Sequence, residues 1–132
     1  MRYADVVFLE TEDVDSAHEE ALAIGGGAPG VLNPGMIASA THAPRSGYYG
    51  SLAELAAVYV HGVAKNHGYQ DANKRTAALV LLKFLGANGY PVDLGPPWEQ
   101  TIEGVADGSI SRDQLVEHVT VLIGGDPIAL ED

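Results

Sequence analysis

The residues of this chain that could do chemistry are concentrated in one nine-residue segment, 67–75. It reads His-Gly-Tyr-Gln-Asp-Ala-Asn-Lys-Arg and comes immediately before a strongly apolar stretch. It contains an imidazole that can accept a proton near neutral pH, a carboxylate that can ligate a metal ion, and two cations that can bind an anion. Together these residue types indicate proton transfer beside a bound anion.

The distribution of positive charge supports an anionic ligand. The chain has 7 Lys and Arg residues against 18 Asp and Glu residues, yet four of the seven cations lie between positions 65 and 83, where Asp71 is the only acid. We therefore expect a local positive pocket, for which a nucleotide phosphate is the natural ligand. The net charge of -11 argues against direct binding of nucleic acid, because a polyanion would be repelled.

Each polar residue of the segment can be given a role. If a helix begins at 71 or 72, then Asn73, Lys74 and Arg75 lie in its first turn, where unpaired backbone N–H groups favour an anion. Asp71 would either cap this helix or hold Mg²⁺ through one oxygen. His67 could act as a general base, a role that contributes about 10²–10⁴-fold to a rate.

Taken singly, these residues have simpler explanations. An aspartate at this place is more often a helix cap, and a lone loop histidine is usually structural or solvated. Cations in a first helical turn, however, oppose the helix dipole at a cost of roughly a few tenths of a kcal/mol. Two such cations in an acidic chain therefore favour a ligand-binding function.

The rest of the sequence predicts helices that position this segment. We expect helices over 11–24, 34–38, 52–66, from 71 or 72 to about 88, 98–107 and 111–123. Asn33 followed by Pro34 indicates the cap and start of the second of these helices. Two capping boxes, Ser51 with Glu54 and Ser111 with Gln114, indicate the starts of the third and the last.

The fold class follows from the same pattern. Because 77–85 is apolar on almost every side, it is typical of a helix buried by its neighbours. We therefore expect an all-α fold, a helical bundle around this central buried helix, with at most short extended pieces at 6–9 and 91–94. The 132 residues are expected to form one domain with its core at about 8–123, and the acidic tail at 126–132 is expected to be loose.

Composition also limits the cellular context. The chain has no cysteine, which excludes disulfides and thiol catalysis and fits a reducing compartment. It has no apolar run of about 18 residues that could span a membrane, and its first ten residues lack the features of a secretion signal. We therefore expect a cytoplasmic protein with no membrane association.

The segment resembles the signature motif of the Fic/Doc superfamily, and in particular that of the death-on-curing (Doc) toxins. The general Fic pattern is His-Pro-Phe-x-(Asp/Glu)-Gly-Asn-Gly-Arg, whereas Doc-like members have His-x-Phe-x-Asp-x-Asn-Lys-Arg followed by Thr-Ala. Here 67–77 reads His-Gly-Tyr-Gln-Asp-Ala-Asn-Lys-Arg-Thr-Ala. Lys74, where Fic enzymes keep glycine, places the chain on the Doc side, and similar features such as His18 extend over roughly 8–123.

This resemblance implies a helical fold with the motif at the start of its central helix, and an ATP-dependent activity that uses Mg²⁺. Doc toxins transfer the terminal phosphate of ATP to a protein hydroxyl; their target is a threonine of elongation factor Tu, and translation halts. Carried over to this sequence, His67 is the general base and Asp71 holds the Mg²⁺. Asn73, Lys74 and Arg75 bind the phosphates.

Three positions depart from the family pattern. Lys65 is the candidate for a cation that Doc uses just before its histidine. Gly68 replaces a proline or aliphatic residue and is expected to loosen the loop that carries His67. Tyr69 replaces phenylalanine, which costs little if its hydroxyl finds a partner.

The resemblance also implies partners. Doc toxins are restrained by a separate antitoxin, so we expect a cognate, Phd-like antitoxin whose disordered tail folds on binding. The loop 44–50 falls where the superfamily has a flap that docks the target protein, although an ordinary surface loop is an equal alternative. Two other functions stay open: transfer of AMP to a protein hydroxyl, and a catalytically weak scaffold that only pairs with the antitoxin.

Overall fold

The computed structural model describes all residues, 1–132, and contains six α-helices and two short 3-10 helices without a β-strand. The predicted all-α fold is confirmed. No helix of the structure is long and apolar enough to cross a membrane. The elements are η1 (Tyr3–Asp5), α1 (Thr11–Gly25), α2 (Pro34–His42), η2 (Ala43–Ser46), α3 (Leu52–Lys65), α4 (Asn73–Ala87), α5 (Pro97–Asp107) and α6 (Arg112–Leu122).

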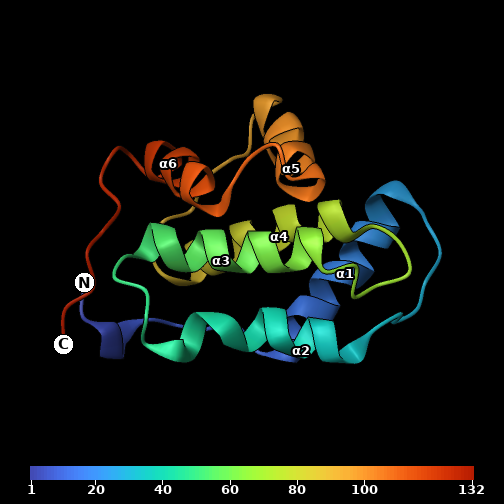
Figure 1. Ribbon diagram of the computed structural model, residues 1–132, viewed down its shortest axis with the longest axis horizontal. Helices are drawn as coiled ribbons and strands as arrows, with labels where there is room; N and C mark the ends of the chain where they lie inside the picture. The colour runs from blue at the N-terminus through green and yellow to red at the C-terminus, as the bar shows by residue number, and fades with distance from the viewer.

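Helix α3 lies at the centre of the bundle. Ten of its fourteen residues are buried, and it packs against α2 on one side and α5 and α6 on the other, with α4 beside it (Figure 1). By contrast, Ala78, Leu79 and Leu82 of α4 are only half-buried. The expectation that 77–85 forms the central helix is therefore corrected, because the small residues of α3 let more helices approach it; a Cβ on Gly62 would lie 2.9 Å from the Cβ of Ala40.

Local side-chain signals set most helix starts. Where the sequence predicts a capping box at α3, only half of it forms, since the Glu54 carboxylate accepts from the N–H of Gly50 and not of the N-cap. At α1 the carboxylate of Asp13 accepts from the N–H of Glu10, so that helix begins as expected. The N-cap side chains confirmed in the structure are those of Asn33, Ser51 and Ser111.

The two expected extended pieces do not form strands. The main chain of Val7 instead exchanges two hydrogen bonds with the side chain of Asn88, at 2.8 and 3.0 Å. The N–H of Leu9 donates to the hydroxyl of Tyr59 at 2.9 Å. Side chains at the end of α4 and on α3 thus take the place of a neighbouring strand.

The acidic tail is bound to the rest of the molecule, in contrast to the expectation of a loose end. The carbonyl of Ile128 accepts from the N–H of Leu52, and the N–H of Leu130 donates to Gly50, both at 2.9 Å. The N–H of Glu131 donates to Met1 at 2.9 Å, so the two termini lie side by side (Figure 1). The tail thereby supports the start of α3.

Candidate active site

The segment 67–75 forms one wall of a cleft of about 1090 Å³ between the start of α4 and helix α5. The opposite wall is built from residues of 94–107. Five of the six residues predicted for the site line this cleft together: His67, Asp71, Asn73, Lys74 and Arg75.

Lys65, the sixth, does not line the cleft. Its ammonium lies near the end of α5, where a Cβ on Gly108 would be 3.4 Å from Nζ. The pKa of Asp107 there is lowered, first by hydrogen bonds from Ser109 and to a smaller extent by the charges of Lys65 and Lys74. A cation beside the carboxyl end of a helix is favourable, which accounts for this placement.

The backbone of the motif loop bends at non-glycine residues. His67 has φ 48° and Ala72 has φ 64°, whereas Gly68 lies outside the left-handed region. An L-residue in that region is disfavoured by about 1–2 kcal/mol, so the surrounding structure must hold these two residues in place. The two strained residues, His67 and Ala72, thus lie at the two ends of the loop that contains Asp71.

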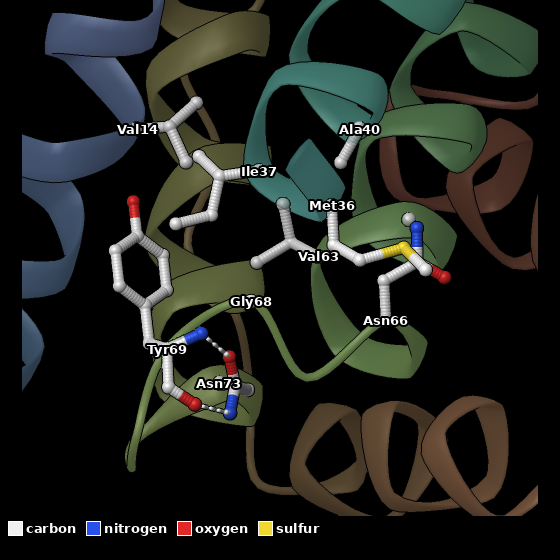
Figure 2. A pocket seen from close by; sticks show the side chains of 10 residues that line it. Val14, Met36, Ile37, Ala40, Val63, Asn66, Gly68, Tyr69 and Asn73 are labelled. Carbon is white, nitrogen blue, oxygen red and sulfur yellow. Dashed lines mark hydrogen bonds between the residues drawn. The ribbon is translucent and has the colours of Figure 1, made fainter. Parts of the chain in front are cut away.

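Gly68 fixes the loop to α2 and does not loosen it. Its carbonyl accepts from the N–H groups of Leu32 and Asn33, each at 2.9 Å. A Cβ at this position would lie 2.5 Å from Cγ1 of Ile37, and Figure 2 shows Gly68 directly below Ile37 and Val63. Glycine is needed here for close approach, and the expectation of a loose loop is wrong.

Asn73 and Tyr69 clamp the loop from within. The Asn73 side chain accepts from the N–H of Tyr69 at 3.1 Å and donates to its carbonyl at 3.0 Å (Figure 2). The buried Tyr69 ring stacks on His18 with centroids 3.8 Å apart, and its hydroxyl donates to Asp15 at 2.6 Å. Burial, followed by this bond to Asp15, raises the pKa of Tyr69. The hydroxyl group that Tyr69 has and phenylalanine lacks therefore has a hydrogen-bond partner. The side-chain amide of Asn73 holds the loop.

Asp71 is exposed and held in its ionised form. One carboxylate oxygen accepts from the N–H of Ala72 at 2.8 Å and the other from Ala28 at 3.2 Å. These two bonds, in that order, are the main causes that lower the pKa of Asp71. Its carbonyl accepts from Nε2 of His18 at 2.9 Å, which ties the loop to α1.

The two cations of the motif have different surroundings. The guanidinium of Arg75 donates to the carbonyl of Ala21 in α1 and lies where a Cβ on Gly25 would be 2.6 Å from its Cζ. The ammonium of Lys74 reaches the carboxylate of Glu103 on α5 at 2.9 Å, and both side chains are more than half exposed. Arg75 is thus anchored, whereas Lys74 spans the cleft in a weak ion pair.

The cleft as a whole is not positively charged, which corrects the expectation from sequence. Folding brings three carboxylates of α5 opposite the motif, and Lys83 points elsewhere, toward the carbonyl of Asp13 at 3.5 Å. Charge spacing along the chain could not reveal this, because these acids lie about 25–35 positions beyond the motif. The acids that line the cleft are Asp71, Glu99, Glu103 and Asp107.

The start of α4 has no side-chain cap, and neither has the start of α5 on the opposite wall of the cleft. The N-cap residue of α4 is Ala72, whose side chain has no acceptor, and no side chain accepts from the N–H groups of 73–75. These groups therefore remain available to an anion in the cleft. Asp71 does not cap this helix, because its oxygens are directed to Ala72 and Ala28.

The segment beside the motif loop is 28–33, whereas the loop 44–50, for which a docking flap and an ordinary surface loop are equal alternatives from sequence, does not lie there. The N–H of Gln70 donates to Gly30 at 3.0 Å, and Val31 forms a bridge with Tyr69. The loop 44–50 lies at the opposite end of α3, a distance of about 21 Å for fourteen helical residues. The glycine-rich composition of 25–30 was the only sequence signal for this arrangement, and it indicates no more than a helix stop.

Comparison with known proteins shows the family of this chain. The sequence model described as "Fic/DOC family" matches residues 8–85. The chain is 32% identical over 121 residues to "Protein kinase doc" of Escherichia phage P1, covering 88% of this chain and 95% of that protein. It is 34% identical over 87 residues to "Toxin Doc" of Mycolicibacterium smegmatis, covering 62% of this chain and 65% of that protein. The chain belongs to the Fic/Doc family.

Proposed function

We propose that this protein is a Doc-type toxin that transfers the terminal phosphate of ATP to a Ser or Thr hydroxyl of a target protein, with elongation factor Tu as the expected target. One observation carries the proposal: His67, Asp71 and the uncapped start of α4 line the same wall of one cleft. The names of the two relatives, one a kinase and one a toxin, support it.

The phosphates of ATP would lie against the start of α4. The backbone N–H groups of 73–75 have no side-chain acceptor, and the charges of Lys74 and Arg75 stand beside them. Arg75 is already oriented by the carbonyl of Ala21, so little side-chain freedom is lost when it binds an oxygen. Lys74 would leave Glu103 for a phosphate oxygen.

His67 would take the proton of the target hydroxyl. Its side chain is exposed at the cleft, and its backbone is held in a left-handed conformation. This conformation fixes the direction in which the side chain leaves the backbone. As the hydroxyl oxygen bonds to the γ-phosphorus, the bond to the bridging oxygen breaks, ADP leaves and the proton passes to the imidazole.

Asp71 fits a role in holding Mg²⁺. Its carboxylate is exposed and ionised, and each oxygen accepts only one hydrogen bond, which leaves a lone pair for a metal ion. With Asp71 as a single protein ligand, the remaining ligands would be phosphate and water, as Mg²⁺ prefers. Bound there, Mg²⁺ would neutralise charge on the phosphates.

The target protein would dock beside the motif loop on segment 28–33. Val31 and Leu32 are 53% and 61% exposed there, and the segment is hydrogen-bonded to the loop that carries His67. Exposed apolar side chains at such a place favour protein contact. The proposed regulatory partner is a cognate, Phd-like antitoxin that folds on binding, in keeping with the relative named a toxin.

A catalytically weak scaffold is the second candidate. The specific observation in its favour is the set of three α5 carboxylates facing the motif, which would oppose binding of a triphosphate. AMP transfer is the third candidate function, and it differs from phosphate transfer in the group that becomes attached to the target protein.

The test is incubation of the purified chain with Mg²⁺, elongation factor Tu and ATP labelled in its γ-phosphate, followed by intact-mass measurement. The proposal predicts label on the factor and a mass gain of one phosphoryl group, both lost in His67→Asn. A gain equal to AMP would establish the other transfer. No modification by the folded chain, whatever the variant, would favour the scaffold.

A further inference from the structure

The cleft is lined by apolar as well as charged side chains. The charged ones belong to the motif wall and to the three acids of α5. The apolar ones, which a phosphate would not contact, are Ala78, Leu94, Pro96, Trp98, Ile102 and Ala106. A ligand that fills the cleft therefore meets apolar surface as well as the charged groups of the motif.

Trp98 is the only tryptophan of the chain, and it lines the cleft. It is half-buried, and its ring meets that of His118 on α6 edge-on, with centroids 6.2 Å apart and an angle of 71°. It follows Pro96 and Pro97 at the start of α5, where proline fixes the backbone. The indole is thus in contact with α6 and carried by a rigid helix start.

Trp98 and the motif wall line the same cleft. The ion pair of Lys74 with Glu103 joins α5 to the start of α4, and Trp98 lies in the first turn of α5. A nucleotide whose phosphates lie against the motif wall can therefore place its base on α5 within this one cleft.

We propose that Trp98 forms the nucleobase subsite of this cleft, so that the base of a nucleoside triphosphate stacks on the indole while its phosphates lie against the motif wall. The inference rests on the proposed function, because it takes the phosphate end as given. Stacking of a base on an aromatic side chain contributes about 1–3 kcal/mol.

Because Trp98 is the only tryptophan, its fluorescence reports on this subsite directly. The wild-type chain is titrated with ATP and with inorganic tripolyphosphate, each with Mg²⁺, by fluorescence and by calorimetry. We expect saturable quenching by ATP and binding of tripolyphosphate without quenching. Trp98→Leu should weaken ATP by about 5- to 150-fold, the equivalent of the stacking energy, and leave tripolyphosphate within about twofold.

Trp98→Phe is the matched variant, because it keeps a π-face and the packing against α6. It should retain most of the ATP affinity, and unfolding curves of both variants check that the fold is intact. Equal losses for ATP and tripolyphosphate in Trp98→Leu, or no loss for ATP, would overturn the subsite.

The two proposals fail in different ways. If tripolyphosphate binds and ATP gains nothing from Trp98, the subsite is wrong while the phosphate site stands. If ATP binds through Trp98 but no phosphate reaches a target protein, the subsite stands and the proposed function fails. Binding of neither ligand removes both.

Discussion

Helices α4 and α6 begin in opposite ways. At α6 the hydroxyl of Ser111 accepts from the N–H of Gln114 at 3.1 Å, and the Gln114 side chain accepts in return at 2.9 Å. At α4 the N-cap is Ala72, in a left-handed conformation and without a side-chain cap. Since an N-cap contributes about 1 kcal/mol, α4 lacks a stabilisation that α6 has. The family motif thus lies at a helix start that has no side-chain cap.

The unsatisfied start persists because the loop before it is held from outside. The stack of Tyr69 on His18 and the bond from His18 to the Asp71 carbonyl tie the loop to α1, and the bonds of Gly68 tie it to the segment that leads into α2. Arg75 adds a bond to Ala21. Contacts of this kind can keep a strained backbone in place, whereas α6 needs only its own side chains.

The largest expected effect comes from His67→Asn. Asparagine adopts the left-handed region readily, so this change should preserve the backbone while removing the base. We expect phosphate transfer to fall by about 10²–10⁴-fold, with an unchanged melting temperature. A variant that transfers phosphate at the wild-type rate would show that the motif wall does not need an imidazole.

Gly68→Ala should break the external support of the loop. The added Cβ would lie 2.5 Å from Cγ1 of Ile37, so we expect a loss of about 1–3 kcal/mol in the free energy of unfolding, measured by denaturant titration. In an Ile37→Ala background the same change should be milder, because the opposing atoms are gone. Equal losses in both backgrounds would mean that the clash is not the cause.

The pH dependence of stability tests the hydrogen bonds of Asp71. The pKa of Asp71 is depressed in the folded state, so the stability from its bonds is complete above its ordinary titration range and is lost only as the pH falls below about 4. Unfolding curves should therefore show no loss of this contribution between about pH 5 and 7. A loss within that range that Asp71→Asn abolishes would contradict this assignment.

Ser111→Ala tests the capped start of α6. We expect it to lower the free energy of unfolding by about 1 kcal/mol, because α6 loses its cap, and to leave phosphate transfer unchanged. Ser111→Asp keeps an acceptor and serves as the control. A fall in transfer beyond what the unfolded fraction explains would show that the two helix starts are coupled.

The smallest effect is expected for Glu103→Gln. It releases Lys74 from an exposed ion pair that is worth about 0–1 kcal/mol, so ATP should bind up to about fivefold more tightly in calorimetry. Glu117→Gln, an exposed change of equal charge on α6, controls for the net charge of the chain. Weaker binding in Glu103→Gln would instead show that this carboxylate supports the ligand.

Sequence predicted those features that depend on near neighbours along the chain. The caps at Asn33, Ser51 and Ser111 each involve a residue three positions away, so their signals are local. The residues of the motif segment are also near neighbours along the chain, and they lie together in one loop and the first turn of α4.

Features that depend on distant residues could not be predicted in this way. Glu103 faces Lys74 across 29 positions, and the need for glycine at 68 is set by Ile37 on another helix. The central place of α3 depends on its small residues being matched by four neighbouring helices, which periodicity within one segment does not reveal.

The most direct test of the account is a crystal structure of the chain with Mg²⁺ and a non-hydrolysable ATP analogue. The account predicts the phosphates at the N–H groups of 73–75 with Lys74 turned from Glu103 toward them, the γ-phosphate within reach of His67, and the base on Trp98. An analogue bound elsewhere, with the ion pair across the cleft still closed, would contradict it.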